Sequence, residues 1–441
     1  MNIPDEVLIV GLGATGIATA KFLAGMKKKI TITDAKREEE LAAALKELAG
    51  VQFDGHFGGH RIDDFLSHPL IVISPGVDSE LPELKQARQI GIKVIGEIEL
   101  ASAFVNEPII AITGTNGKTT MTSLLGEMFT RARGDVFVGG NIGNPLINYV
   151  LEGRKARYVI LEISSFQLET IETFHPNISV LLNITEDHLD RYRSYGDYVK
   201  AKYRIFENQT DKDYAIINNN IRPDCGIAAK KLFFTTGGVL EEGAFFDNGS
   251  MYVRLKGKES VYKRDLSPLV GIHNTENILS ALLVSSICGI EKHVIEETLR
   301  NFKGLAHRVE PVRELNGVKF YNDSKATNVD AARRALESIE GKVILIAGGK
   351  DKGGSYKVIS GLMNKVKGMV LIGEAKGRIS DELGSMTKTY MENNLSDAVK
   401  RAIEISDRGD AVLFSPMCSS FDMFRDYKER GNIFKKLVES M

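Results

Sequence analysis

The sequence has little cysteine, and what it has is widely scattered. The three cysteines are Cys225, Cys288 and Cys418, and no two of them have the spacing of metal ligands. We expect all three to be small apolar side chains of the interior. So few cysteines, without a disulfide framework, are typical of a protein from a reducing compartment.

An excess charge of one sign and long apolar runs are also missing. The 57 basic and 58 acidic residues leave a formal net charge of −1, so no overall field attracts nucleic acid or an anionic membrane. The apolar runs, such as residues 343–347, have the length of a strand and cannot span a bilayer. Residues 1–5 do not begin a secretory signal. We therefore expect a cytoplasmic, monomeric protein without nucleic-acid or membrane partners.

What the sequence does contain is a regular alternation of short β-branched segments and longer helical patterns. Its 441 residues suffice for about three domains. The alternation predicts α/β domains with mainly parallel sheets and helices on both faces. The predicted strands are residues 7–10, 30–33, 70–74, 109–113, 158–163, 178–183, 215–218, 319–322, 343–347, 369–372 and 411–415, and the predicted helices include 15–25, 119–131 and 292–301.

Two breaks in this alternation divide the chain. We place the domains at residues 1–98, 99–304 and 305–441. Residues 232–270 have a different character, with short strands and the turn signal Asn248-Gly249. They predict a small antiparallel addition to the middle domain.

The strongest chemical pattern is a glycine-containing loop at residues 113–120. A buried strand precedes it, and Lys118-Thr119 opens the following helix. The backbone N–H groups of such a loop, with the positive helix end, bind phosphate oxygens. Lys118 would neutralise the β- and γ-phosphates and Thr119 would hold Mg²⁺. Because Ile112 replaces the usual first glycine, the middle domain is a variant of the P-loop ATPase type.

Two further positions favour nucleotide chemistry. Glu162 lies near the end of one apolar strand, and His188 follows another. Ligands of open α/β sheets collect at the carboxyl ends of strands. Both side chains are therefore candidates for a Mg²⁺ site. Each signal is common without a metal, and it is the combination with the loop that favours this interpretation.

A second glycine pattern opens the chain. Residues 11–16 fit G-x-G-x-x-G between a strand and a helix, and Asp34 ends the next strand. This is the fingerprint of a Rossmann-like dinucleotide site, and alone it indicates a nicotinamide-dependent oxidoreductase. The pattern requires only a pyrophosphate at a helix N-terminus, so a UDP group suits it equally. Residues 74–76 add another tight loop at the same edge.

In the last third of the chain, three polar loops each follow a predicted strand. They comprise residues 322–328, 348–354 and 415–422. In a Rossmann-like sheet they would converge on one face rich in Lys, Ser and Thr. Such a face suits a small dicarboxylate, although any one loop alone would be read as an ordinary solvated connection.

Together these motifs resemble the Mur ligase family over essentially the whole chain and in the same domain order. Further family motifs match residues 271–277, 305–308 and 323–328. The 323–328 loop, with the 348–354 loop, is similar to the members that add D-glutamate. The Asp-Asn-Pro-Arg signature of the diamino-acid-adding relatives is absent.

The resemblance implies a role for each of a set of residues. ATP would be bound by Gly114, Thr115, Asn116, Gly117, Lys118, Thr119, Thr120, Asn274, Asn277, Arg308 and Asp323. Mg²⁺, or Mn²⁺ in its place, would be held by Thr119, Glu162, His188 and a carbamate of Lys202, and the catalytic residues would be Lys118, Glu162, His188 and Lys202. UDP-N-acetylmuramoyl-L-alanine would contact Thr15, Asp34, Gly76, Asn141, Ser164 and Gln167, and D-glutamate would contact Thr327, Lys352, Ser420 and Phe421. Ala35-Lys36 depart from the hydroxyl and arginine of the family pattern at the uracil end.

The reaction implied is an ATP-dependent ligation in peptidoglycan precursor synthesis. A carboxylate does not react with an amine in water, because its leaving group is oxide. Phosphorylation to an acyl phosphate solves this, and the amine then attacks to give a tetrahedral intermediate that loses phosphate. Mg²⁺ and Lys118 would screen the repulsion between the two anions of the first step. A third domain hinged near Leu305 could close over the middle one and exclude water.

Other functions stay open on the sequence. A nicotinamide-dependent oxidoreductase would explain residues 11–16 and leave the phosphate loop without a purpose. Another Mur or folylpolyglutamate-type ligase would share the chemistry with a different amine, and the 348–354 loop argues against it. A non-catalytic nucleotide switch would not need the acid, the histidine and the loops of the third domain.

Overall fold

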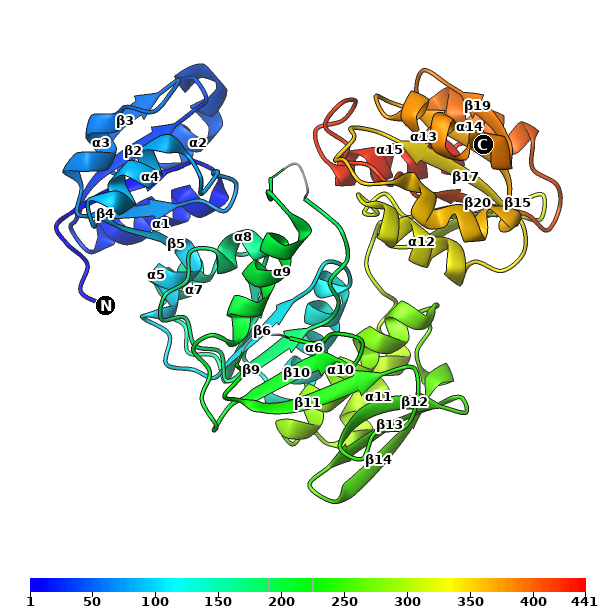
Figure 1. The fold of residues 1–441 in the computed structure, drawn as a ribbon, viewed down its shortest axis with the longest axis horizontal. Helices are drawn as coiled ribbons and strands as arrows, with labels where there is room; N and C mark the ends of the chain where they lie inside the picture. The colour runs from blue at the N-terminus through cyan, green and yellow to red at the C-terminus, as the bar shows by residue number, and fades with distance from the viewer. Residues whose placement is uncertain (189–190, 224–225) are drawn as a thin grey trace.

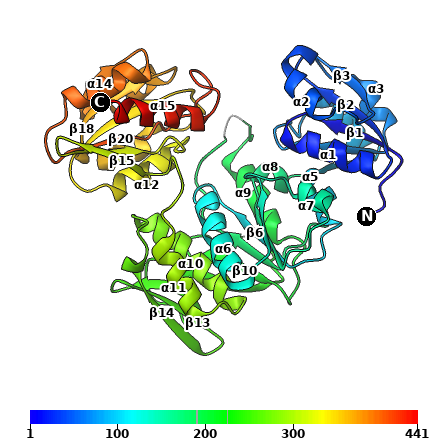
Figure 2. The same ribbon diagram turned by 180° about the vertical axis from the view of Figure 1, so that it is seen from behind.

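The computed structural model describes residues 1–188, 191–223 and 226–441, and in these ranges the strands form three sheets flanked by helices (Figure 1). The expected α/β architecture of three domains is confirmed. Figures 1 and 2 show the N-terminal domain in blue and the C-terminal domain in yellow to red, both carried above the central domain. No helix of the described ranges is long and apolar enough to span a membrane.

The N-terminal sheet has the strand order β3-β2-β1-β4-β5, with all pairs parallel. Its elements are β1 (Glu6–Val10), α1 (Ala14–Gly25), β2 (Lys29–Asp34), η1 (Glu38–Leu41), α2 (Ala42–Glu47), β3 (Asp54–Phe57), α3 (Ile62–Ser67), β4 (Leu70–Ile73), α4 (Pro82–Gln89) and β5 (Lys93–Gly96). The order reverses between β1 and β4, so the loops after these two strands border a crevice. The Rossmann-like fold predicted for this domain is therefore present.

The central sheet has the order β14-β13-β12-β11-β10-β9-β6-β8-β7. Its elements are α5 (Glu97–Ser102), β6 (Ile109–Thr113), α6 (Lys118–Arg133), β7 (Val136–Gly140), α7 (Leu146–Glu152), β8 (Tyr158–Glu162), α8 (Ser165–Leu168), β9 (Ile178–Leu181), α9 (Tyr195–Tyr203), η2 (Arg204–Phe206), β10 (Tyr214–Asn218), β11 (Lys230–Thr235), β12 (Gly243–Asp247), β13 (Ser250–Leu255), β14 (Lys258–Lys263), η3 (Arg264–Leu266), α10 (Ile272–Ile287) and α11 (Lys292–Asn301). Strand β6 is buried along its whole length between β8 and β9, which fixes the phosphate loop at its carboxyl end.

Two apolar layers cover the faces of the central sheet. One joins α6, α10 and α11 through residues such as Leu125, Leu282 and Ile295. The other is continuous with the N-terminal domain, because Leu23 of α1 and Ile147 of α7 belong to the same cluster. The N-terminal domain is therefore attached to the central one by a shared core.

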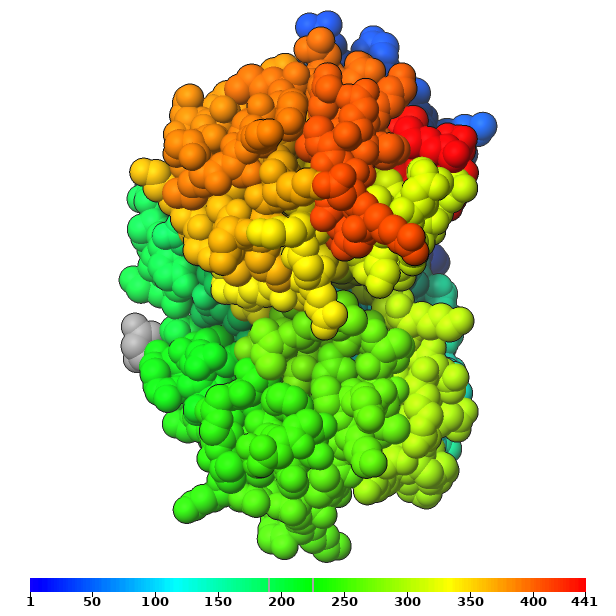
Figure 3. Space-filling model, turned by 90° about the vertical axis from the view of Figure 1, so that its right-hand side faces the viewer, coloured from blue at the N-terminus to red at the C-terminus, as the bar shows by residue number. Residues whose placement is uncertain are grey.

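The C-terminal sheet has the order β15-β16-β20-β17-β18-β19, and only β15 pairs antiparallel. Its elements are β15 (Glu310–Leu315), β16 (Val318–Asn322), α12 (Val329–Ser338), β17 (Val343–Gly348), η4 (Tyr356–Lys365), β18 (Val366–Ile372), α13 (Lys376–Leu383), η5 (Gly384–Met386), β19 (Lys388–Met391), α14 (Leu395–Glu404), β20 (Ala411–Phe414) and α15 (Tyr427–Glu439). Apolar clusters of its own cover both faces. Figure 3 shows this domain, in yellow and orange, resting on the green central domain.

Two sequence expectations need comment. Residues 232–270 are not a separate antiparallel unit: β11 and β12 pair in parallel with the strands before them and extend the central sheet, and only β13 and β14 are antiparallel. Alternation of apolar and polar residues predicts a strand but not its direction, and the Asn248-Gly249 turn signal predicts antiparallel pairing only for the two strands that it joins. Among the cysteines, Cys418 is buried, Cys288 is half-buried and Cys225 lies outside the described residues.

Candidate active site

The phosphate loop lies at the carboxyl end of β6 and is held by the neighbouring strand end. The backbone N–H of Asn116 donates to Asn183 Oδ1 at 2.8 Å, and the N–H of Thr115 donates to Asn183 O at 2.9 Å. Gly117 precedes α6 with φ +87°, and a Cβ there would lie 2.3 Å from Asn277 Oδ1. The loop therefore needs glycine at this position both for its backbone conformation and for room.

Two lysines, the half-buried Lys118 and the buried Lys202, converge on one carbonyl of this loop. Lys118 Nζ donates to Gly114 O at 2.8 Å and to Thr115 O at 2.9 Å, and Lys202 Nζ donates to Gly114 O at 2.9 Å. Burial lowers the pKa of Lys118, against the opposing pull of Glu162. Burial and the nearby Lys118 cation pull the pKa of Lys202 well below its usual value. Both Nζ atoms thus lie at the loop where phosphate oxygens would bind.

Glu162 ends β8 beside the loop and has one unpaired oxygen. Its Oε1 accepts from Asn141 Nδ2 at 2.7 Å, whereas the buried Oε2 has no hydrogen-bond partner. An orphaned carboxylate oxygen in the interior is costly and fits a cation at this position. Thr119 Oγ1 accepts from the Arg308 guanidinium at 3.1 Å, which brings the third domain to the same point.

His188 lies on the loop after β9, at φ +57°. Its ring packs edge-on against Phe166 with a centroid separation of 4.8 Å, and its Nε2 is 3.7 Å from Asp187 Oδ2. Among the described residues no group of three or more His, Cys, Asp or Glu side chains could hold a metal by itself. Mg²⁺ commonly takes part of its coordination from phosphate and water oxygens.

Six of the residues expected to bind ATP line a cavity between the central and C-terminal domains. Gly117, Thr120, Asn274, Asn277, Arg308 and Asp323 all line it. Burial raises the pKa of Asp323 to about 7, although Ser415 Oγ donates to its carboxylate at 2.7 Å. Burial also lowers the pKa of Arg308, against the pull of Glu162 and Asp323. The half-buried Arg308 and the buried Asp323 thus both face the cavity.

A second cavity, of about 600 Å³, lies over the crevice of the N-terminal sheet. Its lining includes Thr15, Asp34, Gly76, Asn141 and Gln167, five of the six residues assigned from the sequence to the nucleotide-linked substrate, and this assignment stays a prediction. Asp34 does not stand free, because its Oδ2 accepts from the backbone N–H of Leu12 at 2.7 Å. Ser164 lies outside this lining, where it caps α8 by accepting from the N–H of Gln167.

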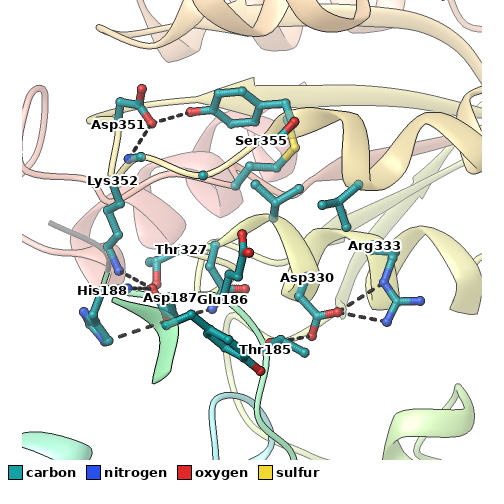
Figure 4. A pocket seen from close by; sticks show the side chains of 18 of the residues that line it. Thr185, Glu186, Asp187, His188, Thr327, Asp330, Arg333, Asp351, Lys352 and Ser355 are labelled. Carbon is teal, nitrogen blue, oxygen red and sulfur yellow. Dashed lines mark hydrogen bonds and ion pairs between the residues drawn. The ribbon is translucent and has the colours of Figure 1, made fainter. Parts of the chain in front are cut away.

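A third cavity, of about 420 Å³, opens between the loop after β9 and the C-terminal domain (Figure 4). Thr327, Lys352 and His188 line it. Lys352 Nζ is 3.5 Å from Asp187 Oδ1, and the Asn328 side chain donates to Asp187 Oδ2 at 2.9 Å. Ser420 and Phe421 are not among its lining residues: Ser420 is buried, and Phe421 is 70% exposed. Their contact with an amine substrate therefore stays a prediction.

Sequence reasoning missed several residues that the fold brings to the site. Asp187 accepts a hydrogen bond from Asn328 and forms an ion pair with Lys352, and the local sequence did not single it out. Lys325 Nζ lies 3.8 Å from the centre of the Tyr427 ring, and burial lowers its pKa to about 7. Its position inside the 323–328 loop was the available signal. Nothing in the local sequence marks Tyr427, because its partner is about 100 residues away.

Comparison with known proteins matches all three domains to one family. Residues 5–96 match the MurD-like N-terminal domain of Mur ligases, residues 112–285 the Mur ligase middle domain, and residues 307–418 the glutamate ligase domain of Mur ligases. A protein of Geobacter metallireducens named UDP-N-acetylmuramoylalanine–D-glutamate ligase is 48% identical over 99% of this chain and 97% of its own length. A protein of Thermoanaerobacter pseudethanolicus with the same name is 42% identical over 99% of this chain and 98% of its own length.

Solved structures agree on the fold. The UDP-N-acetylmuramate–alanine ligase of Thermotoga maritima has a TM-score of 0.61 at 19% identity, over 99% of both chains. The MurF ligase of the same organism, solved in complex with ADP, has a TM-score of 0.62 at 18% identity, over 93% of this chain and 95% of its own. At these identities the similarity concerns the architecture alone.

Proposed function

The chain belongs to the Mur ligase family, and on this premise we propose that it joins D-glutamate to UDP-N-acetylmuramoyl-L-alanine with ATP, releasing ADP and phosphate. The acid is activated as an acyl phosphate, the amine attacks, and a tetrahedral intermediate collapses with loss of phosphate. ATP and a UDP-linked acid as substrates imply a cytoplasmic enzyme of peptidoglycan precursor synthesis. We also propose that the enzyme is a monomer.

One observation carries this proposal: the cations Lys118 and Arg308 lie with the buried Lys202 and Glu162 around the phosphate loop. Transfer of a phosphoryl group to a carboxylate brings two anions together. Preorganised cations in a water-poor site stabilise the charge that develops there. A site for hydride transfer has no need of such a cluster, which disfavours the oxidoreductase.

In the proposed reaction the phosphate loop and α6 bind the triphosphate, with Lys118 on the transferred group. Asn277, Arg308 and Asp323 orient the nucleotide, since they line the cavity next to Gly117. The crevice around Thr15 and Gly76 holds the UDP part, and Asn141 and Gln167 direct the acid towards the loop. These assignments rest on cavity lining and on the family resemblance together.

Glu162, Thr119 and His188 would hold Mg²⁺, with Mn²⁺ as a substitute, and the bound ion would supply charge neutralisation between the phosphate oxygens and the substrate carboxylate. The orphaned Oε2 of Glu162 supports this part. We propose Lys202 as a carbamate: its unprotonated amine adds to CO₂ and forms an N–C bond, one proton is released, and a neutral buried amine becomes an anion. A pKa pulled well down by burial and Lys118 favours the unprotonated amine that this addition needs.

On the amine side, Thr327 and Lys352 would contact D-glutamate in the 420 Å³ cavity, with Lys352 paired to one carboxylate. Ser420 and Phe421 remain in the proposal on the family resemblance alone. The other ligases of the family differ in the amine that they accept. The identity of the amine is therefore the part of the proposal that an experiment can test most directly.

The deciding experiment is phosphate release from ATP with UDP-N-acetylmuramoyl-L-alanine and a panel of amines. Release with D-glutamate alone supports the reaction and the amine. Release with L-alanine, a diamino acid or another amine retains the ligase and overturns the amine assignment. No release with any amine, together with reduction of NAD(P)⁺ by a hydroxy acid, would return the oxidoreductase to first place.

A further inference from the structure

Helix α12 of the C-terminal domain runs from the amine cavity to the nucleotide cavity. Asp330, in its first turn, lines the cavity that contains Lys352. Arg334, one turn later, lines the cavity that contains Asn277. The two side chains are paired, with Arg334 Nε 3.0 Å from Asp330 Oδ2. The Asp330–Arg334 ion pair therefore connects the linings of the two cavities.

The Asp330 carboxylate also holds the central domain. Its Oδ2 accepts from Asn116 Nδ2 of the phosphate loop at 2.9 Å. Figure 4 shows its other partners: Oδ2 accepts from Thr185 Oγ1 at 3.3 Å, and Oδ1 accepts from Arg333. The residue is 7% exposed. Burial opposes its ionisation, but Arg334 and Arg333 keep its pKa below the usual value. The Asp330 carboxylate is thus ionised and accepts hydrogen bonds from two loops of the central domain.

Arg334 makes the matching contact on the nucleotide side. Its Nη1 lies 3.1 Å from Glu276 Oε2 on α10 of the central domain, and each side chain is 14% exposed. The other oxygen of Glu276 accepts from Asn218 Nδ2 at 3.3 Å. The chain Asp330, Arg334, Glu276 therefore crosses the domain boundary twice, at the phosphate loop and at α10.

Separating the domains would break both crossings at once. Asn116 and Thr185 would lose their acceptor, and Glu276 would lose the cation that compensates its partial burial. Removing one partner of a poorly hydrated charge pair is expensive, because the other charge stays uncompensated. The arrangement in which α12 rests on the phosphate loop is stabilised by all of these contacts together.

We propose that Asp330, Arg334 and Glu276 are positioning residues that couple the two ligand sites, so that filling the amine cavity strengthens nucleotide binding and the reverse. The inference rests on the proposed function for the identity of the two ligands. Linkage makes the coupling reciprocal, and such couplings commonly amount to between about 5- and 150-fold in affinity. None of the three residues needs to touch a reacting atom for this role.

The test measures the dissociation constant of ADP by calorimetry on the full chain, with and without saturating amine, using the amine that phosphate-release assays identify. In the wild type we expect the amine to tighten ADP on the order of 10-fold. In Glu276→Gln and Asp330→Asn we expect the dissociation constant of ADP to be the same with and without the amine. The KM for the amine should rise on the order of 10-fold, with a smaller change in kcat.

Non-additivity gives the sharper readout, because Glu276 and Asp330 are connected through Arg334. The double variant should be no worse than the poorer single variant, and in an Arg334→Gln background neither substitution should add a further loss. Glu337→Gln is the matched control, since Glu337 pairs with Arg333 within α12 and should leave the coupling unchanged.

Three results would overturn the inference: no effect of the amine on ADP binding in the wild type, a coupling that survives Glu276→Gln, or strictly additive losses. These amide variants are chosen to keep side-chain volume, and small-angle scattering provides a second measurement, with a larger radius of gyration expected for each variant without ligand. A different amine in the release assay would revise the proposed function and leave this test intact.

Discussion

The guanidinium carbon of Arg191 lies 3.7 Å from the centre of the Phe166 ring, and the same guanidinium donates to the carbonyl oxygens of Pro75 and Val77 at 3.1 and 2.9 Å. Phe166 belongs to α8 of the central domain, and its ring also contacts His188. Pro75 and Val77 line the cavity of the N-terminal domain. One side chain thus aligns the proposed UDP site with the loop that carries His188.

Replacing Arg191 should therefore weaken binding of the nucleotide-linked acid. We expect Arg191→Ala to raise the KM for this substrate on the order of 10-fold, since two carbonyls lose a charged donor. Arg191→Lys should recover little, because an ammonium cannot make the two-pronged, stacked contact. Steady-state kinetics with each substrate varied in turn measures this. Arg193→Ala is the control: Arg193 pairs with Glu80 across the same boundary while 77% exposed, and should change KM less than about twofold.

Gly117→Ala should abolish nucleotide binding without unfolding the chain. The added Cβ would meet Asn277 Oδ1 at 2.3 Å, in a backbone conformation that non-glycine residues rarely adopt. Gly153→Ala isolates the two effects, because Gly153 has φ +61° but open space around its Cβ position. Calorimetry with ADP should show binding for Gly153→Ala and none for Gly117→Ala. Equal losses in both variants would indicate that backbone strain alone is responsible.

Lys118→Ala should lower kcat on the order of 10²–10³-fold if this lysine stabilises the charge on the transferred phosphoryl group. Lys118→Arg should not restore the rate, because the Lys118 ammonium donates to two loop carbonyl oxygens, Gly114 O at 2.8 Å and Thr115 O at 2.9 Å, and a planar guanidinium does not reproduce that geometry. Single-turnover phosphate release measures the chemical step directly. A rate within a few-fold of the wild type would exclude Lys118 from that step.

Stability should fall as the pH rises through the titration of Asp323. Its pKa is raised by burial from 3.8 to about 7, so the folded state holds this proton more tightly than the unfolded state does. Unfolding then releases a proton between about pH 4 and 7, and the free energy of unfolding decreases by a few kcal/mol across that window. Above pH 7 both states are ionised and the decrease ends.

Asp323→Asn should remove this decrease while keeping the side-chain shape. The measurement is the denaturation midpoint of both proteins at intervals from pH 4.5 to 8. Glu97, whose pKa burial also raises to about 7, contributes equally to both proteins and cancels in the difference. A difference that does not change with pH would contradict a raised pKa at Asp323.

Much of the fold was predictable because its signals are local. The strand predicted at residues 109–113 coincides with β6, and the helix predicted at 292–301 coincides with α11. A continuous apolar run and a helix with one apolar face are both recognisable from neighbouring residues alone. Strands β3, β5, β7 and β19 were not among those predicted. All four lie at sheet edges. Much of β3, β7 and β19 is exposed or half-buried, so their apolar pattern is weak, whereas β5 is mostly buried but only four residues long.

The domain boundaries show the same limit. The predicted break after residue 98 falls inside α5, which packs against α7 of the central domain and whose Glu99 accepts four backbone and hydroxyl donors from residues 172–174. A linker that is itself a buried helix has no compositional signature. The boundaries at 98 and 304, and the closure of a domain hinged near Leu305, stay predictions.

The sequence by itself determined the chemistry of each strand-end loop, because a phosphate loop needs only neighbouring residues: two glycines, a lysine, a threonine and a helix start. The tertiary structure alone decided which loops meet. Asn116 and Asp330 are 214 residues apart, and Lys202 reaches Gly114 across 88 residues. Such contacts depend on sheet order and domain packing, where many weak apolar interactions act together. No local sequence pattern predicts the combined effect of these interactions.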